Sequence, residues 1–305
     1  MNYIYGPVPS RRLGLSLGIS PIPKKTCNYS CIYCQLGRTN KMTNEPKNFF
    51  DVKDIIKEFD ESLLINNEFD VVTIVGEGEP TLYYDLKELI KEIKKRTDKP
   101  VAVITNGALL YEKRVKEALN EADIVLPTFD AYDESTFKKI NRPHGQLSFQ
   151  KVYNGLVEFS AQYKGELWLE MMFIKGVNED DISIEKYKEK LKNIKYDKLY
   201  LNTPVRPPSE EYVKPISHKR MDEIATELKA ISIDLLASQG FYSNINDHLE
   251  AIKSIIKRHP MNQFEIKGFL LNRKCKNINN ILKMLNEDCE IEVISYQSYD
   301  TYRLK

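Results

Sequence analysis

The feature that most constrains the fold is a regular alternation of strand-like and helix-like segments over the first 240 residues. Apolar, β-branched runs alternate with segments whose apolar residues recur at helical spacing. The predicted strands are "LGLSLGIS", 70–76, 101–105, 122–129, 166–174 and a run ending near Asn202. Strands that alternate with helices form βα units and a parallel sheet. About six such units are too few for a complete eight-fold barrel, so we predict an α/β fold with an open, partial (β/α)6 barrel.

The segments between the predicted strands have the apolar spacing of helices, and the motifs at the strand ends indicate where the candidate site lies. Helices are expected around 51–65, 84–96, 110–120, 134–140, 149–163 and 182–193, and a long pattern from Ser217 to about Ala237 closes this part of the chain. In barrel folds the active site lies at the C-terminal ends of the strands. The segments at these ends are "GEGEPT" (76–81), "TNG" (105–107), "FDAYD" (129–133), "IKGVN" (174–178) and "NTPVRPP" (202–208). A cysteine-rich segment follows the first strand and falls on the same face.

The pattern changes after Asn244. An amphipathic helix is stopped by Pro260, two short helices follow at about 262–271 and 277–288, and two short strands end the chain. This order is that of a winged-helix module. We therefore predict two domains, a partial barrel at 1–240 and a small α+β winged-helix-like domain at 244–305.

Three of the five cysteines, Cys27, Cys31 and Cys34, lie within eight residues with the spacing C-x3-C-x2-C. Four thiolates would complete a [4Fe–4S] cluster or a structural zinc site, whereas three leave one metal position open to an exchangeable ligand. The alternative is zinc completed by a distant histidine, although none of the four histidines is near in sequence. The spacing favours an iron–sulfur cluster. Cys275 and Cys289 are interpreted as ordinary residues of the C-terminal module.

The formal net charge of +1 hides a basic N-terminal segment. Residues 1–44 contain no Asp or Glu, and their six cationic residues are Arg11, Arg12, Lys24, Lys25, Arg38 and Lys41. Such a run is usually a solvated surface, but here it brackets the cysteines, where cations would stabilise thiolates and attract an anionic ligand.

The location of the protein is predicted from what its sequence lacks. No apolar run approaches the ~18–20 residues that span a bilayer. The first residues lack the apolar core of a signal peptide. We therefore expect a cytoplasmic protein with no membrane partner, in which clustered cysteines bind metal rather than form disulfides.

The cysteine spacing with Tyr33 just before the last cysteine resembles the signature of the radical S-adenosylmethionine (SAM) superfamily. "GEGEPT" is similar to that family's glycine-rich segment, which binds the amino group of SAM, although Glu77 stands between the glycines. "IKGVN" is similar to the segment that packs on the adenine. Residues from about Leu13 to Pro208 are compatible with the family's partial barrel. The opening "YGPVPSRRLGLSLGI" with "CNYSCIYCQLGRT" resembles a group of archaeal and bacterial members that is loosely related to the tRNA wyosine-base synthetases.

This resemblance implies two cofactors, a [4Fe–4S] cluster and SAM. The three cysteines would hold three irons, and the fourth would bind the amino and carboxylate groups of SAM. One electron would cleave SAM to methionine and a 5′-deoxyadenosyl radical, which abstracts hydrogen from a substrate. The residues implied in cofactor binding are Tyr33, beside the cluster and adenine; Gly76, Gly78, Glu79 and Pro80, at the amino group; and Ile174 and Gly176, at the adenine.

Several polar residues at the strand ends are candidates for the rest of the site. The carboxylate of SAM needs a cation, and the guanidinium fork suits it; the candidates are Arg11, Arg12, Arg38, Arg142 and Arg206. Asn106 and Asp130 are candidates for the ribose hydroxyls or the substrate, the alternative being turn or cap residues. Glu170 faces inward or outward depending on register. Asn202 opens a proline-rich loop expected to lie over the site.

The substrate is left open between tRNA, a peptide and a small molecule, and no catalytic residue is assigned. From 244 to 305 ten Lys/Arg stand against eight Asp/Glu, a modest excess for a module that binds phosphates. An electron donor such as a ferredoxin or flavodoxin is expected. The alternative function is a non-catalytic regulator, in which an iron–sulfur cluster and a winged helix sense iron or oxygen.

Overall fold

The main sheet has eight strands in the order β1-β2-β5-β6-β7-β8-β9-β10. The computed structural model describes residues 3–65, 68–233, 241–243, 245–296 and 299–305. The strands of this sheet are β1 (Ile4–Ser10), β2 (Gly14–Ile19), β5 (Val71–Ile74), β6 (Val101–Thr105), β7 (Ile124–Pro127), β8 (Glu166–Met172), β9 (Lys198–Asn202) and β10 (Ile231–Ser232). All neighbours pair in parallel except β1 and β2, which form an antiparallel hairpin. The six expected strands are β2 and β5 to β9, so the predicted partial barrel is confirmed.

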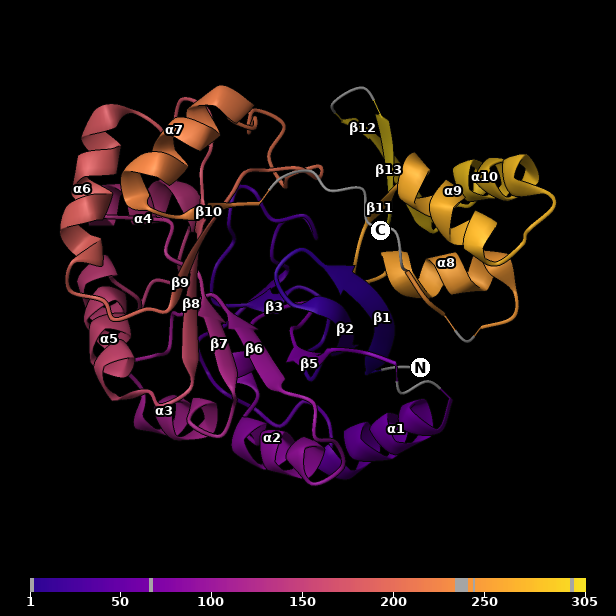
Figure 1. Cartoon of the computed structure of the whole chain (residues 1–305), viewed down its shortest axis with the longest axis horizontal. Helices are drawn as coiled ribbons and strands as arrows, with labels where there is room; N and C mark the ends of the chain where they lie inside the picture. Colours follow the sequence, from indigo (N-terminus) through magenta and orange to yellow (C-terminus); the bar gives the residue numbers. More distant parts are fainter. Residues whose placement is uncertain (1–2, 66–67, 234–240, 244, 297–298) are drawn as a thin grey trace.

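Helices cover the outer side of this sheet in an arc from α1 to α6 (Figure 1). Their bounds are α1 (Val52–Ile65), α2 (Leu86–Lys94), α3 (Lys113–Leu119), α4 (Glu134–Ile140), α5 (Phe149–Gln162), α6 (Asp181–Leu191) and α7 (His218–Leu228). Side chains cap the N-termini of several, because Asp133, Ser148 and Asp180 accept backbone N–H bonds from the first turn. Within the described residues, no helix combines the length and apolar character needed to cross a membrane.

The sheet packs an apolar layer on each of its two faces, and strand β8 contributes side chains to both layers. Leu167 and Leu169 join the core between the sheet and the helices, whereas Trp168 packs with Tyr200 in a cluster inside the sheet. Neighbouring strand residues point to opposite faces. Glu170 therefore shares the inner face with Trp168, which settles the orientation that its sequence position left open.

The long pattern that begins at Ser217 forms a helix only as far as Leu228. Helix α7 ends there because Lys229 adopts a left-handed conformation, with φ 52°, and the chain continues as β10 alongside β9. Ile233 then packs in the inner apolar cluster. Apolar spacing alone does not distinguish a continued helix from this added strand, and burial of Ile233 decides it. Residues 234–237 of the pattern lie outside the described residues.

The C-terminal part has its own buried cluster and a second sheet. Its elements are α8 (His248–Ile256), β11 (Met261–Asn262), α9 (Gln263–Asn272), α10 (Ile278–Glu287), β12 (Ile291–Tyr296) and β13 (Tyr299–Leu304), with sheet order β11-β13-β12. These are the three helices and the hairpin that the sequence predicts, with β11 added. The assignment as a winged helix and the boundaries 1–240 and 244–305 stay predictions. We call residues 245–305 the C-terminal module.

The C-terminal module packs against the hairpin edge of the barrel, on the side opposite α5 and α6 (Figure 1). Val8 of β1 belongs to the buried cluster of the module. Arg258, at the end of α8, lies over the ring of Tyr5 at 5.3 Å. Gly18 of β2 leaves room for that ring, since a Cβ there would come within 2.2 Å of it. The hairpin therefore links the barrel to the module.

Candidate functional site

The three cysteines lie on a loop that follows β2, at the C-terminal side of the sheet. The loop begins with the short strand β3 (Thr26–Cys27), which pairs with β4 (Lys41–Met42). It is held from the other side by the connection after α4: Ile32 N donates to the Ile140 carbonyl at 2.9 Å and Ser30 N to that of Asn141 at 3.0 Å. Backbone bonds on both sides thus position the cysteines.

The glycine-rich segment after β5 lies directly against this loop. Lys25 N donates to the Glu77 carbonyl at 2.6 Å, and Glu79 N donates to the Thr26 carbonyl at 3.0 Å. A Cβ on Gly78 would lie 1.8 Å from the Thr26 carbonyl oxygen, so only glycine fits. A Cβ added to Gly76 would also be crowded, at 3.1 Å from the Gly78 carbonyl oxygen. The predicted proximity of "GEGEPT" and the cysteines is therefore present.

Glu79 has a structural role that the sequence did not reveal. Its buried carboxylate accepts hydrogen bonds from the Thr81 and Thr105 hydroxyls, both at 2.6 Å, and from Asn106 N at 2.8 Å. It also caps the short 3₁₀ helix η1 (Pro80–Leu82), in which Pro80 is the first residue. Glu79 therefore ties the glycine-rich segment to the end of β6, and its backbone N–H is already used by the cysteine loop.

Two asparagine side chains donate to the cysteine sulfurs. Asn106 Nδ2 lies 3.5 Å from Cys27 Sγ and also donates to Asn28 Oδ1 at 2.7 Å. Asn141 Nδ2 lies 3.6 Å from Cys31 Sγ. Asn106 also receives the Ala108 N–H on its own oxygen at 2.9 Å, as in a turn. Its amide groups are thus occupied within the protein, and Asn141 was missed because no motif marks it.

Asp130, at the end of β7, connects the cysteine loop to the barrel interior. Its Oδ2 accepts from the Tyr33 hydroxyl and from Asn141 Nδ2, the latter at 2.9 Å, and its Oδ1 accepts from Met172 N at 2.9 Å. Burial raises the pKa of Asp130 to about 7, although these three donors oppose the rise. Both Asp130 oxygens are therefore engaged, Oδ2 with Tyr33 and Asn141 and Oδ1 with the backbone of β8.

Tyr33 and the segment after β8 share one apolar cluster. Ile174 is fully buried and forms this cluster with Ile32 and Ile140, with Tyr33 and Val177 packed against it. Gly176 turns the chain with φ 70°. The structure thus brings together the two segments that the resemblance assigns to the adenine.

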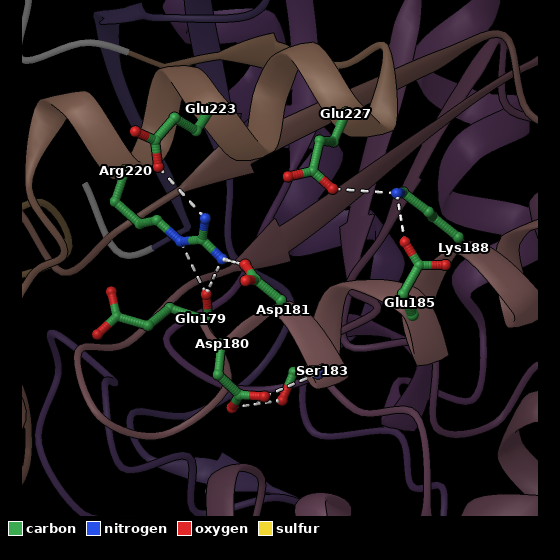
Figure 2. A network of polar contacts seen from close by, with 9 residues as sticks. All are labelled: Glu179, Asp180, Asp181, Ser183, Glu185, Lys188, Arg220, Glu223 and Glu227. Carbon is green, nitrogen blue, oxygen red and sulfur yellow. Dashed lines mark hydrogen bonds and ion pairs between the residues drawn. The ribbon is translucent and has the colours of Figure 1, made fainter.

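Asn178, which sequence reasoning did not single out, organises the segment after β8. It accepts from Ile174 N and donates to the Met172 carbonyl, each at 2.9 Å. Arg220 of α7 holds the next residues: its guanidinium donates to the Glu179 carbonyl and, at 2.6 Å, to Asp181 at the start of α6 (Figure 2). Helices α6 and α7 therefore fix the position of this turn.

The five candidate arginines separate into two groups. Arg38 and Arg142 both bind the Glu210 carboxylate, Arg38 with two bonds of 2.8 and 2.9 Å. These cations lower the pKa of Glu210. Two guanidinium groups thus share this one carboxylate, so Arg38 and Arg142 are paired within the protein. Sequence reasoning did not single out Glu210.

The second group, Arg11, Arg12 and Arg206, lies at the inner face of the barrel. Arg12 pairs with Glu170, and Asn202 Nδ2 donates to the same carboxylate at 2.9 Å. Arg11 donates to Asn202 Oδ1 at 3.4 Å. Arg206 contacts the C-terminal module instead, donating to the Pro260 carbonyl at 2.8 Å. Glu170 and Asn202 are thus interior residues that hold the arginine turn between β1 and β2.

The donor set suits an iron–sulfur cluster. Burial raises the pKa of the Cys27 thiol to about 12 and also raises the pKa values of Cys31 and Cys34, so burial outweighs the expected effect of nearby cations. Bound iron would displace these protons, and Asn106 and Asn141 supply the donors that sulfurs in such clusters accept. In the described part of the chain, no group of three or more His, Cys, Asp or Glu side chains is placed to hold a single metal ion.

The C-terminal module contacts the glycine-rich segment and the cysteine loop directly. The buried Arg258 lies 3.5 Å from the Glu77 carboxylate in the glycine-rich segment. Arg303 donates to the Gln35 carbonyl at 3.2 Å, next to Cys34. Lys24 donates to the carbonyls of the last two residues, at 3.1 and 2.7 Å. Cys275 packs on the core of the module and Cys289 is exposed.

Comparisons with known proteins agree with this site. Residues 22–185 match the family model described as "Radical SAM superfamily". The chain is 38% identical to "UPF0026 protein MJ1312" of Methanocaldococcus jannaschii, over 94% of this chain and 91% of that protein. It is 43% identical to a Brachyspira hyodysenteriae protein named "GTPase Obg", over 94% of this chain, but it spans only 43% of that protein's length.

Among solved structures, a "Structure of TYW1 with a lysine-pyruvate adduct bound" aligns with 95% of this chain and 80% of its own, with 17% identity and a TM-score of 0.48. That similarity carries no argument about substrate. The family model covers more than half of the chain, and the archaeal relative matches it almost end to end. The chain is therefore a member of the radical SAM superfamily, whose enzymes use a [4Fe–4S] cluster and SAM.

Proposed function

We propose that this radical SAM enzyme cleaves SAM reductively and abstracts a hydrogen atom from a substrate bound inside the barrel. The observation that carries the proposal is the contact between the three-cysteine loop and the glycine-rich segment at the C-terminal ends of parallel strands. Bound there, the cluster and SAM supply methionine and a 5′-deoxyadenosyl radical.

The residues of the chain hold and orient the cofactors. Cys27, Cys31 and Cys34 would ligate three irons, while Asn106 and Asn141 donate to two of the sulfurs and would tune the potential. Gly78 allows the backbone of the glycine-rich segment to reach the cysteine loop, beside which the amino group of SAM would bind.

The adenine side and the barrel interior would complete the pocket. Tyr33, oriented by Asp130, and Ile174 form the apolar wall on which the adenine would pack. Gly176 turns the chain beside that wall. Polar residues on the inner face, Arg12 and Glu170, lie beyond Asp130 and would face the substrate. The wall excludes water from the reacting atoms, which protects a radical from side reactions.

The proposal is tested by SAM cleavage. Protein purified without oxygen and loaded with iron and sulfide is reduced with dithionite or with a reduced flavodoxin, and 5′-deoxyadenosine and methionine are measured. We expect both products from the native protein, none from Cys34→Ala, and native amounts from Cys289→Ala, the matched control on an exposed cysteine. Total tRNA and a small-molecule extract are added in parallel, because a bound substrate can complete an active site. Cluster-loaded, SAM-bound protein that forms neither product under any of these conditions would contradict the proposal.

The order of elements in the C-terminal module supports a second candidate, an iron–sulfur regulator with a winged helix. The order helix, strand, helix, helix, hairpin and the sheet order β11-β13-β12 support the winged-helix assignment. A regulator would cleave no SAM and would bind promoter DNA with an affinity that falls steeply with salt. The same preparation, tested for salt-dependent DNA binding, distinguishes the two functions.

A further inference from the structure

A cationic cluster that no cofactor accounts for lies between the barrel and the C-terminal module. Arg11 comes from the turn between β1 and β2, Arg206 from the loop after β9, and His259 from the connection between α8 and β11. Arg206 Nη2 lies 2.8 Å from His259 Nε2. Three segments that are distant in sequence thus converge on one place.

The arginines at this place outnumber the carboxylates that pair with them. Arg12 pairs with Glu170, and Arg206 lies 3.2 Å from the carboxylate of Glu265. Within the described residues, Arg11 donates a hydrogen bond only to the neutral side chain of Asn202. Three guanidinium groups therefore face two carboxylates. Burial, with the repulsion of Arg206 next, lowers the pKa of Arg11 to about 10.

Two arginine nitrogens in this cluster are placed to donate to a bound anion. Arg11 Nη1 and Arg12 Nε are buried and have no hydrogen-bond partner in the described structure. An unpaired charged donor inside a protein is costly, whereas a bound anion would satisfy it. The side chains of Arg12 and Arg206 keep 16% and 17% of their surface exposed, so the cluster borders solvent-accessible space.

His259 adds a neutral donor to this cluster. Arginine has no acceptor, so Nε2 of His259 must accept the Arg206 bond and the ring proton lies on Nδ1. Burial and then the three arginines hold the pKa of His259 well below its usual range, consistent with a neutral ring. Three other groups lie near it: the ring of Phe241 at 5.2 Å, the Arg206 guanidinium, and the Glu265 carboxylate that pairs with Arg206.

The cluster is continuous with the proposed active site. Arg12 pairs with Glu170 on the inner face of β8, and Glu170 in turn raises the pKa of Asp130, which orients Tyr33. A substrate that reaches the cofactor side of the barrel would therefore extend toward Arg11. Arg38 and Arg142, by contrast, share the Glu210 carboxylate at a separate place.

We propose that Arg11, Arg206 and His259 bind an anionic group of the substrate, a carboxylate or a phosphate, at a site that is complete only with the C-terminal module in place. This assignment of a substrate class rests on the proposed function of the same barrel. Arg12 is held by Glu170 and positions the turn that carries Arg11.

Binding of simple anions to the cluster-loaded, SAM-bound protein tests the site. Inorganic phosphate and malonate are titrated separately by calorimetry at constant ionic strength, which distinguishes a phosphate site from a carboxylate site. We expect one of them to bind with one equivalent per chain. Arg11→Met should weaken this binding by about tenfold or more, because a charge-assisted bond is lost. Arg11→Lys should weaken it less, and Arg96→Met, on the outer helix α2 side with Asp60 and Glu92, should leave it unchanged.

The remaining variants distinguish a failure of the anion site from a failure of the proposed reaction. His259→Gln keeps a neutral side chain and replaces Arg11→Met as the test if that variant does not fold. It should weaken binding of the same anion. SAM binding and iron content should be unchanged in every variant. No binding of either anion, or equal binding by Arg11→Met, overturns the site, and loss of SAM binding in that variant would assign it to the carboxylate of SAM instead. Anion binding that depends on Arg11 in a protein that cleaves no SAM would uphold the site and contradict only the proposed reaction.

Discussion

At the scale of single residues, the site depends on a glycine with no space for a side chain and on a buried carboxylate whose oxygens are hydrogen-bonded within the protein. Gly78 lies against the Thr26 carbonyl, and Glu79 uses its carboxylate within the protein. The sequence identified both positions through a motif that implies backbone contacts to SAM. The structure adds a role for the Glu79 side chain, because a buried carboxylate must be satisfied by nearby donors.

Gly78→Ala should destabilise the cysteine loop, because its Cβ would overlap the Thr26 carbonyl by well over an ångström. We expect a loss of about 3 kcal/mol in the free energy of unfolding and reduced iron content after reconstitution. Both are measured by urea unfolding and by iron analysis. The control is Gly145→Ala, whose added Cβ meets no atom within 4 Å. Equal stability of the two variants would show that the loop adapts freely.

Asp130→Asn should alter how stability depends on pH. The pKa of Asp130 is about 7 in the folded protein and near 3.9 in the unfolded chain, so the folded state retains a proton between these values. Its contribution to stability is therefore full below pH ~4 and is lost as the pH rises through 7, by up to about 4 kcal/mol. Urea unfolding of the metal-free protein at pH 5 and 7.5 should show this loss in the native chain and a smaller one in the variant. Parallel pH dependences would contradict the assigned pKa.

At the scale of elements, the βα units were predictable because their periodicities are local. Strands β5 to β9 match the predicted segments closely, since β-branched runs bounded by turn residues have few alternatives. Strand β10 and the end of α7 were not predictable, because burial of Ile233 against Trp168 decides them. Tertiary packing there overrides a local helical pattern.

Arg220→Met should loosen the connection between α6 and α7. The guanidinium bonds the Glu179 carbonyl and Asp181 and is only 22% exposed (Figure 2). We expect a loss of roughly 1–2 kcal/mol and faster hydrogen exchange at residues 174–181. Lys188→Met is the control on the same two helices, because Lys188 makes ion pairs with Glu185 and Glu227 alone in the network drawn. Such exposed pairs contribute less than about 1 kcal/mol. Equal exchange in both variants would disprove a special role for Arg220.

At the scale of the whole molecule, the C-terminal module is joined to the face of the barrel that carries the cysteine loop and the glycine-rich segment. Arg258 reaches the glycine-rich segment, Arg303 the cysteine loop, and Arg206 extends from the barrel into the module. Sequence reasoning that treated the two parts separately did not predict these contacts, because they join residues far apart in the chain.

The ion pair between Arg258 and Glu77 provides a test of this junction. Their side chains are only 3% and 7% exposed, so Arg258→Met would leave the Glu77 carboxylate in a buried site without this cation. We expect a loss of about 3 kcal/mol. The double variant Arg258→Met/Glu77→Gln should recover part of that loss, because no charge then remains unpaired. Thermal and urea unfolding of the two single variants and the double variant measure the coupling. Additive losses would mean that the two residues do not interact energetically.

The sequence by itself predicted the alternating strands and helices of the barrel, the three clustered cysteines, the glycine-rich segment and the family, because each is written in local spacing. Only the tertiary structure decided which arginines pair with carboxylates, which way Glu170 faces, and that Asn141 lies beside Cys31 and His259 beside Arg206. The physical reason is that charge pairing and burial depend on segments that meet across the barrel mouth. Arg11 and His259 are 248 positions apart in the chain, and no local pattern predicts that they share one cluster.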